Sequence, residues 1–183
     1  NILNHYLMTI DFSGKSVLVT GGSGGIGRAI CKVFAQANAN VTIHYHTNRK
    51  SAEKTLASLS GNGHTLIQAN LANPNKVEEL VQSLDSVDVI VNNAAVVEQH
   101  EFDSLSFSDW QDVWKRTIDT NLMGPAYLIF CATKIMRKNG GGKVVNISSR
   151  GAFRGEPKAP AYGASKAGLN ALGQSMAQAL AKD

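Results

Sequence analysis

The chain has 183 residues, 43% hydrophobic and 17% charged, which suits one globular domain with a sizeable core. Its 18 Lys and Arg exceed its 14 Asp and Glu, giving a formal net charge of +4. No basic run is longer than two residues, as at Arg49-Lys50, which argues against a nucleic-acid-binding stripe. A modest positive field suits an anionic small molecule.

The cysteines and the first residues of the chain indicate in which cellular compartment the protein is expected. Cys31 and Cys131 are the only cysteines and lack CxxC or metal-ligand spacing, so we expect buried thiols, no metal site and a reducing cytoplasm. No apolar run approaches the ~20 residues of a membrane span, so no membrane partner is expected. The first seven residues lack the features of a signal peptide, and Met8 would suit an initiator. We therefore treat residues 1–12 as an N-terminal extension and 13–183 as the folded domain.

Short β-branched runs alternate with helical patterns along this domain. Pro74 suits the first turn of a helix, and Ser106 or Ser108 is a candidate N-cap of another. The predicted strands are 16–20, 40–45, 64–69, 87–93 and 142–149, and the predicted helices are 25–37, 49–60, 74–84, 108–138 and 160–182.

Apolar strands separated by helices predict a parallel sheet covered on both faces. This βαβαβ order is typical of an α/β, doubly wound nucleotide-binding fold, a three-layer αβα Rossmann domain.

The stretch "TGGSGGIG" (20–27) lies where the first strand passes into the first helix. Gly21 permits a tight turn, Gly25 lets the backbone approach a phosphate, and Gly27 lets the helix pack closely on the strand. The helix N-terminus offers free amides to a pyrophosphate. A flexible turn with incidental glycines is the alternative, but the position between strand and helix favours a dinucleotide. The missing Gly-Lys-Ser/Thr ending argues against a P-loop NTPase.

Four motifs in order carry a family resemblance. The glycine turn resembles the cofactor fingerprint of the short-chain dehydrogenase/reductase (SDR) family, and "NNAA" (92–95) resembles its Asn-Asn-Ala-Gly, with Ala95 replacing the glycine. Asn121 in "TNLMG", Ser149 in "NISS" and Tyr162 with Lys166 in "YGASK" match its catalytic positions. The match runs from about Ser13 to Asp183. Relatives usually continue for two more strands and a substrate lid, so the chain reads as C-terminally incomplete.

The resemblance implies a set of cofactor contacts. Asn70 and Leu71 resemble the adenine-contacting pair and Asn93 a ribose contact, although each Asn could equally cap a turn. The implied set is Gly21, Ser23, Gly24, Gly25, Ile26, Gly27, His46, Asn70, Leu71, Asn93, Tyr162 and Lys166.

The end of the second strand bears on the choice between NAD and NADP. The stretch "IHYHTNRK" (43–50) lacks the acidic residue that would bond a ribose and repel a 2′-phosphate. Two unit charges ~4 Å apart interact by roughly 4 kcal/mol at an effective dielectric constant near 20. The missing acid, with Arg49 and Lys50 nearby, therefore favours NADP. His46 stands where relatives contact the ribose or its phosphate. Gly24 stands where many NADP-using relatives carry a basic residue, so NAD stays open.

Tyr162 and Lys166 are four positions apart on a predicted helix and share a face. An ammonium ~4 Å away can favour ionisation of a phenol by roughly 4 kcal/mol at that dielectric constant. Lys166 would therefore assist Tyr162 in proton transfer, and the resemblance adds a contact to the nicotinamide ribose. Ser149 would bond the substrate oxygen. Asn121 is implied to hold a water that relays protons to the lysine.

These residues predict reversible hydride transfer between a nicotinamide and a carbonyl or secondary alcohol, with Tyr162 as acid and base. A 3-oxoacyl thioester is our first expectation for the substrate, while a sugar, polyol or steroid stays open. The alternative is a non-catalytic dinucleotide-binding sensor or scaffold. The resemblance further implies a homodimer or homotetramer through the helices at 108–138 and 160–182. Ala164, Ala167 and Gly168 would thin the last helix for close packing.

Overall fold

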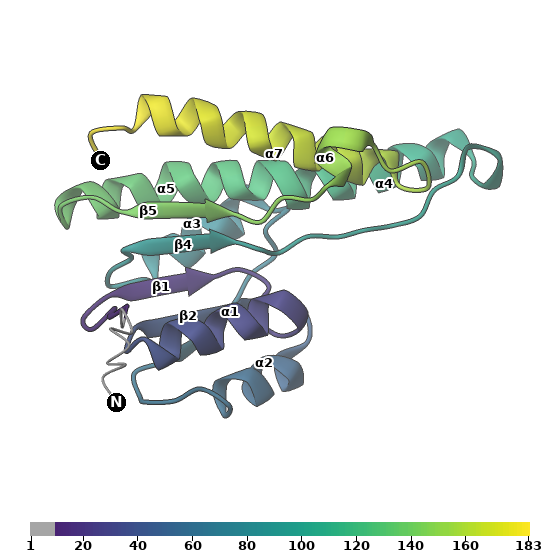
Figure 1. Ribbon diagram of the computed structural model, residues 1–183. Helices are drawn as coiled ribbons and strands as arrows, with labels where there is room; N and C mark the ends of the chain where they lie inside the picture. Colours follow the sequence, from purple (N-terminus) through teal and green to yellow (C-terminus); the bar gives the residue numbers. More distant parts are fainter. Residues whose placement is uncertain (1–9) are drawn as a thin grey trace, which may run out of the picture.

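A computed structural model of the chain describes residues 10–183 (Figure 1). The expected extension at 1–12 lies mostly outside these residues, so the domain boundary stays a prediction. The elements are β1 (Ser16–Val19), α1 (Gly25–Gln36), β2 (Asn40–Tyr45), α2 (Arg49–Leu56), β3 (Thr65–Gln68), α3 (Pro74–Gln82), β4 (Val89–Asn92), the 3-10 turn η1 (Phe102–Ser104), α4 (Phe107–Ile118), the π-helical segment η2 (Asp119–Met123), α5 (Gly124–Lys138), β5 (Lys143–Asn146), α6 (Gly151–Arg154) and α7 (Pro160–Ala179).

The five strands form one parallel sheet in the order β3-β2-β1-β4-β5. Helices α1 and α2 cover one face, and α3, α5 and α7 cover the other (Figure 1). The strand order reverses between β1 and β4, which creates the crevice where doubly wound sheets bind ligands. The predicted fold class, a three-layer Rossmann domain, is therefore confirmed.

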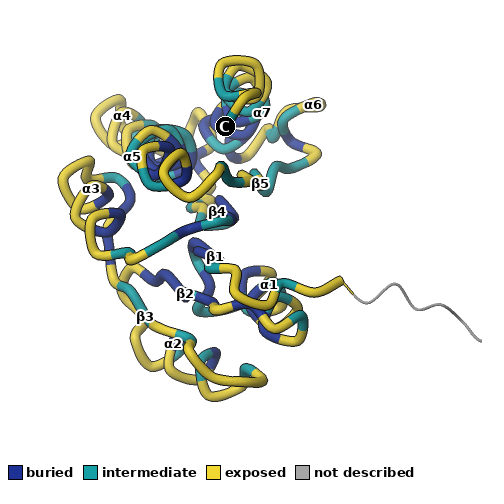
Figure 2. Tube along the Cα trace, turned by 90° about the vertical axis from the view of Figure 1, so that its left-hand side faces the viewer, coloured by how far each residue is buried: buried dark blue, intermediate teal, exposed yellow. Residues whose placement is uncertain are grey.

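Successive side chains of β1 point to opposite faces of the sheet, and the hydrophobic core accordingly has two parts. Leu18 faces α3 and α5 and packs with Ile90 and Leu128, while Val17 and Val19 face the opposite side. This is the period of two expected of a strand buried on both faces. Figure 2 shows the buried strands β1 and β4 between helices whose outer faces are exposed.

Helix α2 and strand β5 end several residues earlier than predicted, and one short helix was not predicted. Helix α2 ends at Leu56 rather than near residue 60, where Ser58, Ser60 and Gly61 favour a turn over a helix. Strand β5 ends at Asn146, so its predicted extent to residue 149 is wrong. The segment after it contains the short helix α6, which the sequence pattern did not indicate.

The predicted helix at 108–138 is interrupted by η2. Pro125 has no N–H and cannot donate to the carbonyl of Asn121, four residues earlier. The Gly124 N–H bonds instead to the carbonyl of Asp119, five residues earlier. A π-segment of this kind often marks a functional site, and Asn121 lies within it.

Strand β5 forms one edge of the sheet, with β4 on its other side. Val144 and Val145 in this strand are 38% and 44% exposed, whereas the four valines, the leucine and the isoleucine of the central strands β1 and β4 are buried. The edge is thus both open and apolar.

Candidate active site and cofactor cleft

A cleft of about 740 Å³ lies at the carboxyl ends of β1, β2, β3 and β4. It includes every predicted cofactor residue except Tyr162 and Lys166. The predicted residues that line it are Gly21, Ser23, Gly24, Gly25, Ile26, Gly27, His46, Asn70, Leu71 and Asn93.

The backbone of the glycine turn lies too close to neighbouring atoms for side chains at Gly21 and Gly27. Gly21 has a φ of 65°, a region that L side chains rarely adopt. A Cβ on Gly27 would overlap the Gly21 carbonyl and lie 2.6 Å from Nδ2 of Asn93. A Cβ on Gly24 would meet open space within the cleft. The turn therefore exposes its backbone to the cleft at Gly24 and packs closely at Gly21 and Gly27, where a side chain would not fit.

Asn93 and Thr20 clamp this turn to the end of β4. Asn93 Nδ2 donates to the carbonyl oxygens of Thr20 at 2.8 Å and Gly21 at 3.3 Å. The Thr20 hydroxyl accepts from the Asn93 and Ala94 amides and donates to the Val91 carbonyl. The amide nitrogen of Asn93 is thus committed to the protein, which leaves its oxygen for the ribose contact that we expected.

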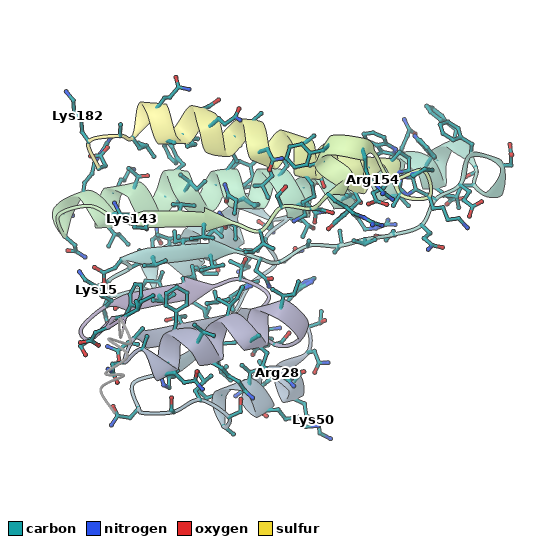
Figure 3. All side chains as sticks on the ribbon, viewed as in Figure 1. Lys15, Arg28, Lys50, Lys143, Arg154 and Lys182 are labelled. Atoms are coloured by element: carbon teal, nitrogen blue, oxygen red, sulfur yellow. The ribbon has the colours of Figure 1, made fainter. Side chains whose placement is uncertain are left out.

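Arg28, a residue of α1, links the same turn to α2 (Figure 3). Its guanidinium donates to the Ser23 carbonyl at 2.8 Å, to the Thr55 hydroxyl at 2.9 Å and to the Ser51 hydroxyl at 3.1 Å. The basic side chains labelled in Figure 3 lie on separate parts of the fold and do not form a stripe.

The end of β2 presents His46, Thr47 and Asn48 to the cleft, with no acidic residue among them. Arg49 is exposed and paired with Glu53, and it does not line the cleft. Among the lining residues the one acid is Glu98, which Arg116 bonds at 2.8 and 3.1 Å. The hydrogen bond from Arg116 lowers the pKa of Glu98, so this pair is ionised and self-neutralising.

Asn70 and Leu71 form the opposite wall. The Asn70 side chain accepts from the Ala72 amide at 3.0 Å, which is the turn-capping role that we had kept as an alternative. Leu71 is 4% exposed and packs beneath Gly124, where a Cβ would lie 2.9 Å from the Leu71 carbonyl.

Tyr162 and Lys166 lie on the first turns of α7, at the same edge of the sheet as the glycine turn (Figure 1). Lys166 Nζ lies 5.7 Å from the centre of the Tyr162 ring and donates to the Ile147 carbonyl at 2.7 Å. Lys166 is 2% exposed, and burial lowers its pKa. Neither residue lines the 740 Å³ cleft; they border the segment that follows β5.

Asn121 connects this region to the cleft. Its side chain accepts from the Val96 amide at 2.8 Å and donates to the Val96 carbonyl at 2.9 Å and the Ser165 hydroxyl at 3.1 Å. Val96 lines the cleft, and Ser165 precedes Lys166. Both side-chain amide hydrogens of Asn121 are therefore used in hydrogen bonds within the protein. A relay water at Asn121 would have to donate its hydrogen bond to a carbonyl oxygen of this residue.

Ser149 lies three residues beyond β5, not within it. Its hydroxyl accepts from the Gly151 amide at 3.2 Å, at the start of α6. The neighbouring Ser148 lines a different hollow, with Phe153 and Leu169, and within the described chain its buried hydroxyl has no hydrogen-bond partner.

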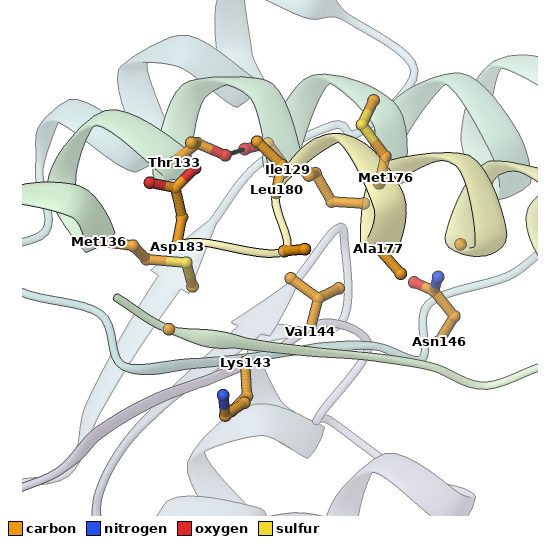
Figure 4. A pocket seen from close by; sticks show the side chains of 13 residues that line it. Ile129, Thr133, Met136, Lys143, Val144, Asn146, Met176, Ala177, Leu180 and Asp183 are labelled. Atoms are coloured by element: carbon orange, nitrogen blue, oxygen red, sulfur yellow. Dashed lines mark hydrogen bonds between the residues drawn. The ribbon is translucent and has the colours of Figure 1, made fainter. Parts of the chain in front are cut away.

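A separate apolar cavity of about 310 Å³ lies between α5, α7 and β5 (Figure 4). Met136, Val144 and Leu180 line it, and Lys143 points away from it across the strand. None of the predicted site residues lines this cavity.

Comparison with known proteins places the chain in a family. The family model described as short chain dehydrogenase matches residues 15–183. The chain belongs to the short chain dehydrogenase family. Its Rossmann sheet, glycine turn and α7 therefore belong to an oxidoreductase fold, as the sequence motifs predicted.

Curated relatives of this short chain dehydrogenase include two bacterial reductases. It is 36% identical over 173 residues to the 3-oxoacyl-acyl-carrier-protein reductase FabG of Staphylococcus aureus, covering 91% of this chain and 69% of the relative. It is 34% identical over 175 residues to the 3-oxoacyl-acyl-carrier-protein reductase of Synechocystis, covering 92% and 69%. A solved short chain dehydrogenase/reductase family protein superposes with a TM-score of 0.84 at 31% identity, covering 93% of this chain and 70% of that one.

The described residues of this dehydrogenase contain no candidate membrane span and no disulfide. No helix within 10–183 is both long and apolar enough to span a membrane. Both cysteines are free thiols; Cys31 is buried, which raises its pKa to about 12, and Cys131 is half-buried.

Two histidines of this dehydrogenase were missed by the sequence motifs. His100 is 1% exposed and accepts from the Ala161 amide at 3.3 Å, one residue before Tyr162. His44 is 2% exposed in β2 and lines the cofactor cleft. A histidine at an inward position of the apolar strand "NVTIHY" was the available signal.

His44 predicts an acid-sensitive contribution to stability. Burial lowers its pKa from 6.5 to about 4, so the folded chain binds the proton less well than the unfolded chain. The contribution of neutral His44 to the free energy of unfolding is therefore fully present above pH 6.5 and is lost as the pH falls towards 4. Between pH 7 and 5 the free energy of unfolding should fall by about 2 kcal/mol more in the natural chain than in His44→Phe. Urea unfolding at both pH values checks this, and equal losses would contradict it.

Proposed function

We propose that this short chain dehydrogenase interconverts a carbonyl and a secondary alcohol, with NADP favoured as cofactor and Tyr162 as acid and base. The observation that carries the proposal is the buried Lys166 ammonium beside the Tyr162 ring at the carboxyl edge of the sheet. Burying a lysine against one backbone carbonyl is costly for stability, which favours a functional reason for its place.

The cleft has the chemistry that a dinucleotide requires. Backbone amides at the start of α1 suit a pyrophosphate, and the open space at the Cβ positions of Gly24 and Gly25 leaves room for it. A bound nicotinamide would supply or accept the hydride. Tyr162 would donate a proton to the carbonyl oxygen in reduction and accept it back in oxidation.

Lys166 and Ser149 support this proton transfer. The positive charge of Lys166 favours the ionised form of the phenol, and Ser149 would donate a hydrogen bond to the substrate oxygen. That role requires the Ser149 hydroxyl to donate outward while it accepts from Gly151, and a hydroxyl can do both.

The names of the relatives support a substrate class. Both bacterial relatives are named as reductases of 3-oxoacyl groups on a carrier protein. A 3-oxoacyl thioester is therefore our first candidate substrate. A homodimer or homotetramer through α4, α5 and α7 is part of the same proposal, and exposed Phe130 on α5 supports it; sedimentation velocity would check the mass.

The cofactor preference rests on the missing carboxylate at the end of β2. We expect carbonyl-dependent oxidation of NADPH to exceed that of NADH, followed by nicotinamide absorbance with a panel that includes 3-oxoacyl thioesters. His46→Asp should weaken NADPH binding by about tenfold or more, because a carboxylate repels a 2′-phosphate. Asn62→Asp, in the exposed turn after α2, adds a negative charge outside the cleft and should leave binding unchanged.

Two results would count against these proposals. A clear preference for NADH would defeat the NADP assignment while leaving the reaction class. Tight binding of either dinucleotide with no turnover of any carbonyl compound would favour the sensor or scaffold instead.

A further inference from the structure

His44 bonds to the protein through both ring nitrogens and its backbone. Its Nδ1 accepts from the Gly21 amide at 3.2 Å, and its Nε2 lies 3.1 Å from the Ala69 carbonyl. Its own carbonyl accepts from the Gly22 amide at 2.9 Å. One residue of β2 thus holds two consecutive amides of the glycine turn.

The partners specify one protonation state of the ring. The Gly21 amide can only donate, so Nδ1 must present a lone pair. The Ala69 carbonyl can only accept, so Nε2 must carry the proton. A second proton on Nδ1 would direct one N–H against another, so the bridge exists only with a neutral ring.

The two partners belong to opposite walls of the cofactor cleft. Gly21 opens the glycine turn, and Ala69 immediately precedes Asn70 and Leu71, which line the other wall. On its far side the turn is already fixed to β4 by Thr20 and Asn93. We infer that His44 is a positioning residue, which sets the separation of the two walls so that a dinucleotide fits between them. The inference rests on the proposed function.

A second histidine allows a matched comparison. His64 also bridges two backbone groups: its Nδ1 accepts from the Val41 amide at 3.1 Å and its Nε2 lies 2.9 Å from the Ser60 carbonyl. It lies outside the cleft lining. If His44 merely fills and satisfies the core, replacing either ring should affect stability and leave dinucleotide binding alone.

The test uses His44→Phe, which keeps a ring and removes both bonds, and His64→Phe as its control. NADPH affinity is measured by fluorescence titration of the whole chain. We expect the Kd and the KM for NADPH to rise about tenfold in His44→Phe, with a smaller change in kcat, because one misplaced wall weakens binding. His64→Phe should stay within about twofold. His44→Asn, whose amide can both accept and donate, should recover part of the loss.

Hydrogen exchange of the Gly21 amide gives a readout that needs no cofactor. We expect this amide to lose protection in His44→Phe and to keep it in His64→Phe. A folded His44→Phe with wild-type NADPH affinity, or with a protected Gly21 amide, would overturn the inference. If His44→Phe fails to fold, His44→Leu carries the same test. If the natural chain binds neither NADPH nor NADH, the proposed function fails, and with it the role in fitting a dinucleotide; Gly21 exchange then reports the bond alone.

Discussion

Replacing Tyr162 with Phe is expected to lower kcat by about 100- to 10,000-fold, the contribution typical of a positioned general acid or base. The substitution removes one hydroxyl and keeps the ring that lies beside Lys166. The backbone bond from the Tyr162 amide to the Ala159 carbonyl also persists, so α7 should begin at the same residue. Steady-state turnover with NADPH and a reactive carbonyl compound measures the loss.

The control is Tyr127→Phe on α5. Tyr127 is also half-buried, but it packs against the core between α3 and α5. Its loss of a hydroxyl should leave kcat unchanged. NADPH affinity should be preserved in Tyr162→Phe, which separates proton transfer from binding. Near-wild-type turnover in this variant would remove Tyr162 from the mechanism.

Gly27→Ala is expected to damage both folding and cofactor binding. Its Cβ would overlap the Gly21 carbonyl and approach Nδ2 of Asn93, which donates hydrogen bonds to the carbonyls of Thr20 and Gly21. Overpacking of this kind typically lowers the free energy of unfolding by about 1–3 kcal/mol. We expect a Tm lower by roughly 2–4 °C for each kcal/mol lost and a weakened affinity for NADPH.

Gly24→Ala serves as the matched substitution in the same turn. Gly24 has an extended backbone, with φ of −168°, and open space at the Cβ position. Its replacement should leave Tm close to that of the natural chain, so it is the control for the stability measurement; NADPH affinity is compared for Gly27→Ala and the natural chain only, because Gly24 lines the cleft. An equal loss of Tm from both substitutions would contradict the crowding at the Cβ position of Gly27.

Local sequence carried enough information to predict which residues line the 740 Å³ cleft. The glycine turn, the end of β2 and the Asn70-Leu71 pair each follow a strand, and parallel strands bring their carboxyl ends to one edge. The cleft could therefore be assembled from strand positions alone. The roles of Tyr162, Lys166, Ser149 and Asn121 stay predictions that the experiments above address.

The misplaced boundaries have physical causes of two kinds. Pro125 was visible in the sequence and explains why the helix is interrupted at Asn121, so that signal was available. The early end of β5 has no such signal, because "NISS" continues an extended pattern and only the start of α6 redirects the chain.

The contacts of His44 could not be read from sequence, because its partners lie 23 and 25 positions away. Only the pairing of β1 with β2 and of β2 with β3 brings Gly21 and Ala69 to one ring. The small residues of α7 show the same limit. Gly168 allows Leu122 to approach, since a Cβ there would lie 2.9 Å from Leu122 Cδ2. At this position the close packing is within the chain, between α7 and η2.

The outer side of β5 has a consequence for the addition of a further strand to the sheet. Its outward N–H and C=O groups, next to Val144 and Val145, form a template onto which a further extended segment can add. Anything that caps this template would also shield the two valines from water, so hydrogen bonding and burial would reinforce each other there. A strand added at this edge, whether from the same chain or from another molecule, would gain both contributions.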